Sequence, residues 1–568
     1  IYTVIKPNLA RRLVKGEVTK TTPMFRELPD AISFRHFPNL AKDFDENPLL
    51  FKRFSTAAPA MLCRDFDNNG RLDFGFQLAR SAGVQVFLNL DGDNFRPVTA
   101  RYNDPSGFMG NAGWLDGFAV IEGKPNFVGA LNKTIPAIES LTQPAALTLR
   151  GDIDGDGTAD AIYITQNTLN DHPAESRAMV FLNQSGSFRR AVDWEQSLGA
   201  LGQVTSAVLV DMDEDGDTDL LVSRDLGAIG LYHNRGDRFV DVSEAFGMLE
   251  FVGLWQGLAV GDFDNDGRVD FAAGNLGRNS PMELYPDGIV HLGRGGKSRL
   301  SLYAIKRGSV HLPVDDMDLY ANIVDRARLP AMYRQFSDID LAKVLDSFDG
   351  LRRTRLNCFE TSVFLNRGGK FERRALPHPA QFSPTSGINV ADFDNDGRED
   401  LLLSQNLYSL RPDWGRLDSS AGMILLGQGD GRFEPVRAGG SGLAILGDSR
   451  NASVVDFNRD GRTDIVATQT FGQTLVYLGQ AGKPGIRVGF AATNSLARRL
   501  GARVRLVYPD GSMSPRRWFH SGDGVMAQCA PEQVLGFGQR PQSIQIEWSN
   551  GTKKAIPVES GKNDYEVP

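Results

Sequence analysis

A nine-residue pattern, D-x-D-x-[DN]-G-x-x-D or a close variant, occurs six times in this chain of 568 residues. The copies are called the first to sixth loops here. They span residues 65–73, 152–160, 211–219, 262–270, 392–400 and 456–464. A motif that recurs along a chain indicates a repeat architecture, in which each copy belongs to one supersecondary unit. Six such copies restrict the fold more than any compositional feature does.

The spacing inside each loop suits a calcium ion, which takes about six to eight oxygen ligands at ~2.3–2.6 Å. Side-chain oxygens at positions 1, 3 and 5 can face one centre, and position 7 can add its backbone carbonyl. The Asp at position 9 then closes the shell. The Gly at position 6 permits a sharp turn that a Cβ would oppose.

The predicted ligands occupy these five positions in each loop, and position 7 contributes only its carbonyl. They are Asp65, Asp67, Asn69, Arg71 and Asp73; Asp152, Asp154, Asp156, Thr158 and Asp160; Asp211, Asp213, Asp215, Asp217 and Asp219; Asp262, Asp264, Asp266, Arg268 and Asp270; Asp392, Asp394, Asp396, Arg398 and Asp400; and Asp456, Asn458, Asp460, Arg462 and Asp464. Asn69 and Asn458 each keep an oxygen but lose a charge. The pattern predicts about six structural Ca²⁺ ions.

The loops are expected in β-hairpins. An EF-hand begins similarly, but it requires a bidentate Glu at position 12 and flanking helices. Position 12 is apolar or small here, from Phe76 in the first loop to Ala467 in the sixth, and β-prone runs such as DLLLS follow the loops. Plain solvated turns also use Asp, Asn and Gly, but six copies in register favour metal loops.

Each loop belongs to a longer unit. After most loops comes an apolar strand, then Asn or Gly, a Gly-rich turn and an aromatic residue, as in VFLNRGGKF ending at Phe371. Such a unit fits a four-stranded propeller blade. The long interval between the fourth and fifth loops predicts two blades, the second having lost its metal loop near 285–305. The interval after the first loop favours an insertion around 103–133 over a further degenerate blade.

The expected fold is therefore all-β: a seven-bladed β-propeller with a small helical insertion, followed by a small C-terminal β domain. Residues 1–24 are expected to form an arm or linker, 25–482 the propeller and 483–568 the C-terminal domain. A strand within 25–62 should close the ring against the last blade, because a closed propeller has no exposed sheet edge.

The repeats resemble the FG-GAP/VCBS repeats that form the blades of integrin α-subunit propellers and of many bacterial surface proteins. GARVRLVYPDG (501–511), FHSGDGVMAQ and QSIQIEWSNGTKKAI (542–556) are similar to the ASPIC/UnbV domain. That domain follows such propellers in the cartilage acidic protein family and its bacterial relatives. The resemblance covers nearly the whole chain from about Phe25. It implies the fold and the metal, and it leaves the molecular task open.

One stretch, at about 315–350, departs from the β pattern. Its apolar spacing predicts two short helices separated by Pro330, with Ser337 and Asp340 as an N-terminal capping box. An insertion of this kind either presents a partner surface or covers blade edges.

Composition narrows the range of possible functions. A net charge of −8 indicates no affinity for nucleic acid, and no apolar run reaches the ~18–20 residues of a membrane span. No signal peptide is visible, although a first residue of Ile1 rather than Met is compatible with a removed leader. The three cysteines, Cys63, Cys358 and Cys529, favour buried thiols; one disulfide of unspecified pairing is the alternative.

Catalytic motifs such as H-E-x-x-H, G-x-S-x-G and a Walker loop are not found in the sequence. His520 and Trp518 are candidates for surface binding, and Trp114, Trp255 and Trp414 for a carbohydrate platform. For all five, packing is the favoured interpretation.

Two functions remain. The first is a noncatalytic adhesion, scaffold or binding protein with structural Ca²⁺ that meets a protein or glycan partner at the cell surface or in an extracellular or periplasmic assembly. The loop shells suit submillimolar to millimolar calcium, which points outside the cytoplasm. The alternative is a calcium-dependent polysaccharide-active enzyme, such as a lyase. It should show an open cleft with convergent basic groups and perturbed carboxylates.

Overall fold

The computed structural model describes residues 22–37, 43–53, 61–77, 83–101, 118–121, 124–127, 145–165, 175–184, 186–284, 289–294, 300–322, 324–345, 350–437, 439–490, 496–520 and 532–567.

Each of the six loops lies in a separate four-stranded antiparallel sheet. The sheets, in the order of their loops, are β2 (Met61–Arg64), β3 (Asp73–Gln77), β4 (Gly83–Asn89) and β5 (Phe95–Arg101); β8 (Ala145–Gly151), β9 (Asp160–Thr165), β10 (Ala178–Gln184) and β11 (Ser187–Arg190); β12 (Gln203–Val210), β13 (Asp219–Asp225), β14 (Gly230–Asn234) and β15 (Phe239–Asp241); β16 (Leu258–Gly261), β17 (Asp270–Ala273), β22 (Ser362–Asn366) and β23 (Phe371–Ala375); β24 (Thr385–Ala391), β25 (Asp400–Gln405), β26 (Met423–Gly427) and β27 (Phe433–Pro435); and β28 (Asp448–Val455), β29 (Asp464–Thr470), β30 (Leu475–Gly479) and β1 (Phe25–Glu27). In every sheet the loop connects the first and second strands, so the predicted hairpin position is confirmed.

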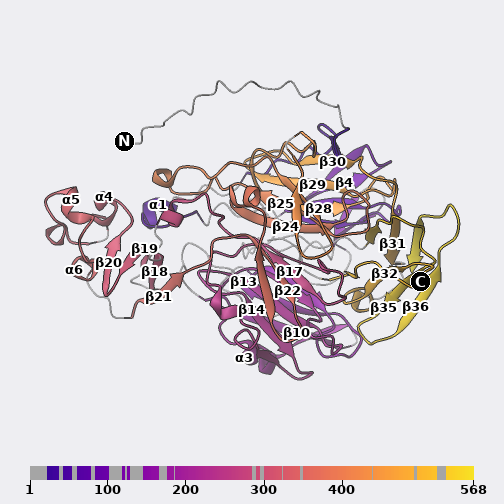
Figure 1. The fold of residues 1–568 in the computed structure, drawn as a ribbon, viewed down its shortest axis with the longest axis horizontal. Helices are drawn as coiled ribbons and strands as arrows, with labels where there is room; N and C mark the ends of the chain where they lie inside the picture. The colour runs from indigo at the N-terminus through magenta and orange to yellow at the C-terminus, as the bar shows by residue number, and fades with distance from the viewer. Residues whose placement is uncertain are drawn as a thin grey trace.

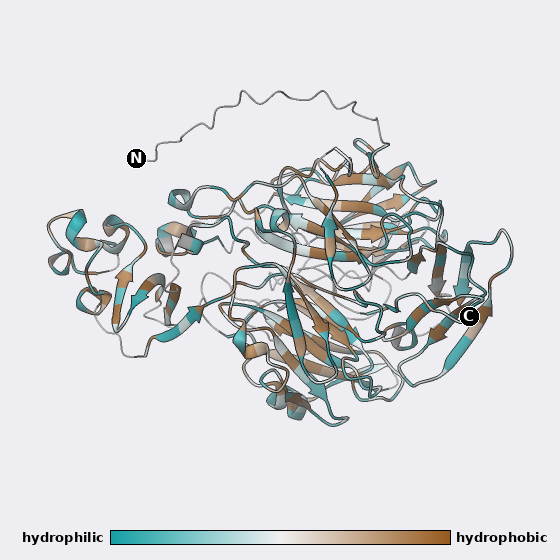
Figure 2. Cartoon of the chain, in the orientation of Figure 1, coloured by the Kyte–Doolittle hydropathy of each residue, from teal (hydrophilic) through white to brown (hydrophobic). Residues whose placement is uncertain are grey.

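The second strand of each sheet begins with the position-9 Asp and continues with a largely apolar run. Every residue of β9, β25 and β29 is buried, including those whose side chains point to opposite faces. Two covered faces are expected of sheets stacked between neighbouring sheets, and they explain why these strands have no alternating pattern. Figure 2 shows hydrophobic residues concentrated along the strands of the loop-bearing sheets.

Asparagines at the ends of third strands join one sheet to the next. The side-chain amide of Asn234 donates to the carbonyl of Ile153 at 2.8 Å, and that of Asn366 donates to Met212 at 3.1 Å. Asn89 likewise donates to Phe457 of the sixth loop at 2.9 Å. The acceptor is each time position 2 of a neighbouring loop, so these sheets follow one another in space.

The N-terminal strand β1 completes the last loop-bearing sheet. It pairs antiparallel with β30, with Phe25 opposite Gly479. The predicted pairing between a strand in 25–62 and the last sheet is therefore confirmed. The first and second loop-bearing sheets are separated by residues 102–144, of which the structure describes β6 (Phe118–Ile121) and β7 (Lys124–Phe127). Closure of the ring at this boundary stays a prediction, as does the insertion at 103–133.

The extra sheet expected between the fourth and fifth loops is present, but it does not follow the fourth sheet as a separate blade. It consists of β18 (Ile289–Arg294), β19 (Leu300–Arg307), β20 (Val310–Pro313) and β21 (Arg352–Leu356), and it interrupts the fourth sheet between β17 and β22. The expectation of two successive blades is corrected in this respect. The spacing of the loops alone does not distinguish an insertion inside a blade from an added blade.

Short helices lie between β20 and β21 of this extra sheet. They are α4 (Met317–Tyr320), η6 (Arg326–Arg328), α5 (Tyr333–Phe336) and α6 (Leu341–Val344), so the two predicted helices are several single turns. Asp340 caps α6 through the N–H of Ala342, whereas Ser337 ends α5 and its hydroxyl donates to Arg334. The capping box is therefore wrong, because Ser337 belongs to the preceding helix. We call 289–356 the inserted lobe (Figure 1, left).

The remaining helices are α1 (Asp43–Glu46), α3 (Val192–Leu198), α7 (Leu496–Arg499), η3 (Met248–Glu250), η4 (Pro281–Leu284), η7 (His378–Gln381) and η8 (Pro412–Trp414). None of the helices in the described ranges has the length and apolar character needed to cross a bilayer. Cys63 and Cys358 are free and buried, and Cys529 lies outside the described residues.

Two further sheets form the C-terminal domain, a name used here for β31 to β37 with the residues 480–485 that lead into them. One sheet contains β31 (Ile486–Phe490), β34 (Glu532–Leu535) and β37 (Asp564–Val567); the other contains β32 (Arg503–Val507), β33 (Arg517–Trp518), β35 (Ser543–Glu547) and β36 (Lys553–Pro557). Their inner faces share a core that includes Val488, Ile544 and Tyr565. The domain lies at the opposite end of the molecule from the inserted lobe (Figure 1).

Candidate metal centres

The structure brings together the carboxylates at positions 1, 3 and 9 of five loops. In each of the first five loops, one oxygen from each of these three residues lies within 4.8 Å of the others. In the sixth loop Asn458 occupies position 3, so positions 1 and 9 offer the carboxylates of Asp456 and Asp464 and position 3 offers an amide oxygen. Close grouping of charged oxygens is the arrangement that a hard divalent cation requires.

Position 1 is held by the turn itself. In all six loops its carboxylate accepts a hydrogen bond from the N–H of the position-6 glycine, at 2.7 Å in the first loop and 2.8 Å in the fifth and sixth. Each of these glycines has a positive φ, from 80° at Gly461 to 99° at Gly216. The left-handed conformation explains the requirement for Gly at position 6, because a Cβ would be strained there.

Position 9 ties the loop to its sheet. One oxygen of Asp219 accepts the N–H of Met212, at position 2, and the other accepts the N–H of Asn234 at the end of the third strand, both at 2.8 Å. Asp400 repeats the arrangement with Phe393 and Gly427, also at 2.8 Å. Position 9 therefore fixes the first hairpin against the third strand, and each oxygen keeps a lone pair for a metal.

The structure does not bring position 5 into these groups. Its side-chain oxygen accepts the N–H of position 7 in every loop, for example from Arg398 to Asp396 at 2.8 Å and from Arg462 to Asp460 at 2.9 Å. This is a local side-chain turn of the kind that Asp and Asn favour. Coordination by position 5 and by the carbonyl of position 7 stays a prediction.

Burial strongly perturbs these carboxyls. Burial, together with the neighbouring loop carboxylates, raises the pKa of Asp219 and of Asp270 to about 8. The pKa of Asp392, at position 1 of the fifth loop, is raised to about 7 by burial above all. In the absence of a cation the folded loops thus favour protonation, and a cation at the centre would favour the charged forms instead.

Several loop oxygens have no hydrogen-bond partner although they are buried. Examples are Oδ1 of Asp152, Asp211 and Asp264, and Oδ2 of Asp464. A buried oxygen without a partner is costly. These oxygens belong to the predicted ligand set. Carboxylate oxygens are ligands that Ca²⁺ prefers, and a bound ion would give each of them the partner that it lacks.

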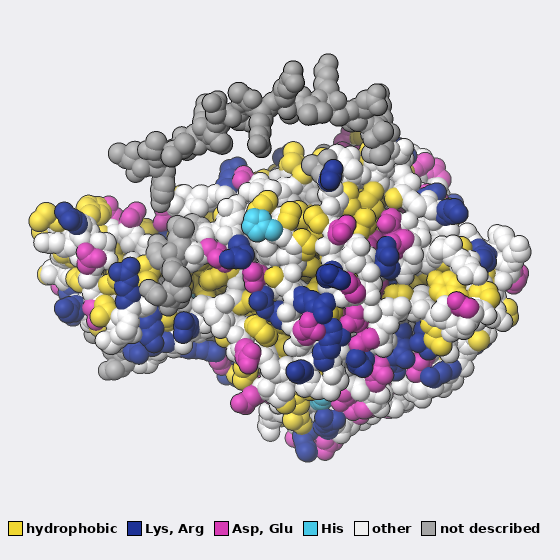
Figure 3. Space-filling view, in the orientation of Figure 1, with side chains coloured by type: hydrophobic (Ala, Val, Ile, Leu, Met, Phe, Trp, Pro, Cys, Tyr) yellow, Lys and Arg dark blue, Asp and Glu magenta, His cyan; other side chains and the backbone are white. Residues whose placement is uncertain are grey.

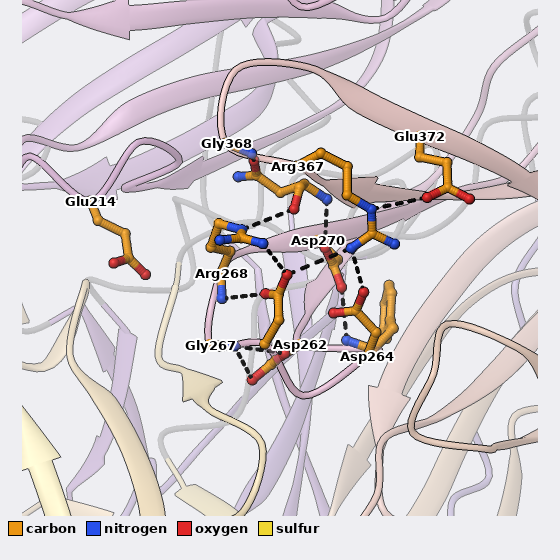
Figure 4. A network of polar contacts seen from close by, with 12 residues as sticks. Glu214, Asp262, Asp264, Gly267, Arg268, Asp270, Arg367, Gly368 and Glu372 are labelled. Carbon is orange, nitrogen blue, oxygen red and sulfur yellow. Dashed lines mark hydrogen bonds and ion pairs between the residues drawn. The ribbon is translucent and has the colours of Figure 1, made fainter.

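Basic side chains of the chain itself also contact the loops. In the fourth loop, Nη1 of Arg367 lies 2.5 Å from Oδ2 of Asp264 (Figure 4). Nη2 of Arg268 lies 2.5 Å from Oδ2 of Asp266. In the third loop, His233 lies 3.2 Å from Asp213. These groups contact positions 3 and 5, and the two arginines supply part of the counter-charge.

The aromatic candidates have packing roles. Trp255 is fully buried, Trp518 is 4% exposed and His520 is 9% exposed. Trp414 is half-buried and its ring packs edge-on against Phe51 at 4.9 Å. Trp114 lies outside the described residues. For the four that are described, the favoured packing interpretation is consistent with the structure.

Two buried glutamates were not among the candidate residues predicted from the sequence. Glu399 and Glu532 line a cavity of about 40 Å³ between the loop-bearing sheets and the C-terminal domain, together with Arg517 and Trp518. Burial raises the pKa of Glu399 to about 8 and that of Glu532 to about 7. Each faces an arginine: Glu399 lies 3.3 Å from Arg517, and Glu532 lies 2.7 Å from Arg487. Glu399 directly precedes Asp400, so the loop motif conceals it.

Two family descriptions match the chain. The FG-GAP-like repeat matches residues 152–222 and 211–273, which contain the second, third and fourth loops. The ASPIC and UnbV family matches residues 492–567, which contain most of the C-terminal domain.

The similar curated proteins share one name. Cartilage acidic protein 1 of Homo sapiens is 24% identical over 356 residues, covering 61% of this chain and 40% of the human protein. The Mus musculus protein is 23% identical over 354 residues, covering 60% of this chain and 41% of its own. The chain thus matches about two fifths of the length of these relatives.

Similar solved structures include BBS1N in complex with ARL6DN, at 8% identity, with 79% of this chain and 97% of that chain covered and a TM-score of 0.27. The V. cholerae biofilm matrix protein Bap1 is 9% identical, with 80% of this chain and 91% of that chain covered and a TM-score of 0.26. Superpositions this poor carry no argument. The chain thus contains FG-GAP-like repeats and a C-terminal ASPIC and UnbV domain, and it is similar in sequence to cartilage acidic protein 1.

Proposed function

We propose that this protein is a calcium-stabilised β-propeller that works outside the cytoplasm as a scaffold or binding protein. The observation that carries the proposal is the grouping of three carboxylates within 4.8 Å in five loops. Oxygen-only ligands suit calcium, whereas Mg²⁺ demands near-octahedral geometry at ~2.0–2.1 Å and keeps several waters. Extracellular calcium modules work at roughly 10⁻⁴–10⁻³ M, a concentration range found outside the cytoplasm.

The proposed ions are structural. Each loop joins the first two strands of its sheet, and the adjacent sheets are joined through position 2 of the loops. At a free calcium concentration about ten times the dissociation constant, each site would add about 1.4 kcal/mol to the free energy of unfolding. We further propose that the six loop-bearing sheets are blades of a closed ring, with residues 102–144 at the remaining boundary. This is six rather than the seven blades predicted from the sequence, because the extra sheet belongs to the inserted lobe.

Thermal unfolding tests the metal. In millimolar calcium the full chain should unfold on the order of 10 °C higher than in excess chelator, since several sites contribute. Magnesium at the same concentration should restore little of the difference, because it fits these loops poorly. An unfolding temperature that is the same in calcium and in chelator would refute the structural role.

The inserted lobe is the proposed partner surface. Its helices α4, α5 and α6 pack on β18 and β19 through a core of their own, which contains Leu302 and Tyr320. Met332 and Tyr333 remain 61% and 56% exposed on the same lobe. Figure 3 shows apolar and basic side chains side by side over this projecting part. Such a surface suits a protein or glycan partner.

Glycan arrays and native pull-downs test the partner. A ligand retained by the unmodified chain should be lost from a Met332→Asp, Tyr333→Ala variant. It should be kept by a Leu249→Asp variant, because Leu249 is 50% exposed but lies outside the lobe. Equal binding by the two variants would show that the inserted lobe is not the partner surface.

No observation on the described residues favours the alternative, a polysaccharide-active enzyme. The cavity that contains perturbed carboxylates, about 40 Å³, is far smaller than the ~300–1,000 Å³ of ligand clefts. Its glutamates are also paired with arginines. The relatives are named cartilage acidic protein rather than as enzymes.

A further inference from the structure

The C-terminal domain covers four of the six loops. A Cβ placed on the position-6 glycine would meet an atom of this domain in the third, fourth, fifth and sixth loops. These atoms are Ser549 O at 3.3 Å from Gly216, Arg516 Cζ at 3.7 Å from Gly267, Gly536 O at 3.3 Å from Gly397 and Pro484 Cβ at 2.9 Å from Gly461. In the first loop the nearest such atom belongs to Arg459 of the sixth loop, and in the second loop none lies within 4 Å.

The covering domain hydrogen-bonds to predicted ligands. The backbone N–H of Arg516 donates to Oδ2 of Asp262 at 3.1 Å, and the backbone N–H of Gly536 donates to Oδ2 of Asp392 at 3.1 Å. Both acceptors are position-1 carboxylates. The docked domain therefore contacts the side chains whose orientation a bound ion would set.

The other two covered loops are contacted differently. Nη2 of Arg503 lies 3.5 Å from Oδ2 of Asp211, at position 1 of the third loop. In the sixth loop the N–H of Gly485 donates to the carbonyl of Gly461 at 2.8 Å. All four covered loops thus form part of one interdomain interface.

The coverage changes the environment of position 1. Asp211, Asp262, Asp392 and Asp456 are at most 8% exposed in the covered loops. The corresponding residues of the first and second loops, Asp65 and Asp152, are half-buried. The covered carboxylates consequently have less access to water, and they depend more on a cation or a hydrogen-bond donor for their charge.

An apolar contact and an ion pair complete the interface. Trp518 of the C-terminal domain packs into a core with Val210, Val260 and Phe271 of the loop-bearing sheets. Nearby, Arg517 pairs with Glu399 at 3.3 Å, and both side chains are at most 5% exposed. Such an interface is stable only if the loops keep the shape against which it packs.

We propose that calcium binding to the third, fourth, fifth and sixth loops and docking of the C-terminal domain are thermodynamically coupled, so that the domain docks on the metal-loaded loops. The inference rests on the proposed calcium binding. Without a cation, the three carboxylates within 4.8 Å in the third, fourth and fifth loops repel one another. The position-1 side chains then lose the orientation that accepts the domain's N–H groups. By linkage, docking raises the calcium affinity of these loops by the same factor that calcium raises docking.

The opposite coupling is the competing explanation. Basic residues outnumber acidic residues in 483–568, although the whole chain has a net charge of −8, so arginines of the domain could replace the ions. However, the donors to Asp262 and Asp392 are uncharged backbone N–H groups, and Arg503 approaches Asp211 only to 3.5 Å. These contacts complement an ion more than they substitute for one.

Hydrogen exchange of the full chain, followed by mass spectrometry, measures docking directly. The interface reporter is peptide 512–520, which contains the amide of Arg516, and the domain reporter is peptide 543–557, which contains β35 and β36. Removal of calcium should speed exchange in the interface reporter at least tenfold and leave the domain reporter unchanged. The domain then undocks without unfolding.

A matched pair of substitutions assigns the effect to the covered loops. Asp394 and Asp154 both occupy position 3, both are half-buried, and each accepts the N–H of position 5 at 3.2 Å. With calcium present, Asp394→Asn should speed exchange in the interface reporter, whereas Asp154→Asn should leave it unchanged. The calcium affinity of the substituted loop should fall in each variant, because Asn keeps an oxygen but loses the charge.

Three results would overturn the inference. Calcium that binds but leaves interface exchange unchanged removes the coupling and spares the proposed calcium binding. Calcium that speeds interface exchange shows that arginines replace the ions. A chain that binds no calcium at all removes the inference and the proposed metal together. The unmodified chain decides among these outcomes, so the test holds even if Asp394→Asn fails to fold.

Discussion

The first and second loops differ from the other four in what lies above them, although all six share one motif. Their position-1 carboxylates are half-buried, whereas those of the covered loops are at most 8% exposed. Internal geometry does not account for the difference, because the glycine N–H reaches position 1 in the second loop at 2.9 Å and in the fifth at 2.8 Å. The motif fixes a hairpin in all six sheets. In four of them it also forms part of the surface on which the C-terminal domain packs.

The largest effect expected on this comparison comes from the apolar anchor of the interface. Trp518→Ala should lower the free energy of unfolding of the docked state by about 3–5 kcal/mol, the usual cost of truncating a buried aromatic side chain. Its Nε1 has no hydrogen-bond partner, so the loss is one of packing. Chemical denaturation should show the C-terminal domain separating first. Met513→Ala, at a residue 41% exposed, is the control and should behave like the unmodified chain.

An effect of intermediate size is expected when the position-6 glycine is replaced in one uncovered and one covered loop. Gly157→Ala and Gly461→Ala both place a side chain at positive φ, 84° and 80°, which costs about 1–2 kcal/mol. Only at Gly461 would the new Cβ also lie 2.9 Å from Pro484 Cβ, so Gly461→Ala should cost at least about 1 kcal/mol more. Urea unfolding of the two variants measures this difference. Equal losses would mean that the coverage of the sixth loop has no energetic consequence.

The smallest effect expected concerns pH in the metal-free protein. The pKa of Asp219 and that of Asp270 are about 8 in the folded chain, far above the ordinary Asp value. The folded state therefore binds more protons than the unfolded state between about pH 4 and pH 8, and its stability falls as pH rises through that window. In chelator the free energy of unfolding should be about 1 kcal/mol lower at pH 8 than at pH 5.5, because loops that open and admit water limit the loss.

Calcium should flatten or reverse this pH dependence, since an ion takes the place of the protons on the same carboxylates. Urea titrations at the two pH values, with calcium and with chelator, make the comparison. Identical slopes in both conditions would mean that the loop carboxylates are not where the metal acts.

Much of the fold could be predicted because its determinants are local. The loop motif specifies its own turn through Gly at position 6 and through the hydrogen bonds of positions 1 and 5, and the apolar runs that follow are strands. The pairing of β1 with β30 was also predicted, because an exposed sheet edge at the end of a repeat array is unfavourable.

The remainder depends on contacts between segments distant in the chain. That β22 returns to pair with β17 after the inserted lobe has no signal in the loop spacing. The asparagines that join neighbouring sheets were visible in runs such as VFLNRGG, but their acceptors, Ile153 and Met212, belong to other repeats. Coverage of four loops was hidden for the same reason, because Arg516 and Gly536 stand in no recognisable motif.

The most direct test of the central claim is a count of bound calcium. The full chain, stripped of metal and then dialysed to equilibrium against millimolar calcium, should hold about six ions by elemental analysis, and the count should fall by about one for each loop whose position-1 Asp is replaced by Ala. A count near zero, or a count indifferent to these replacements, would contradict the account.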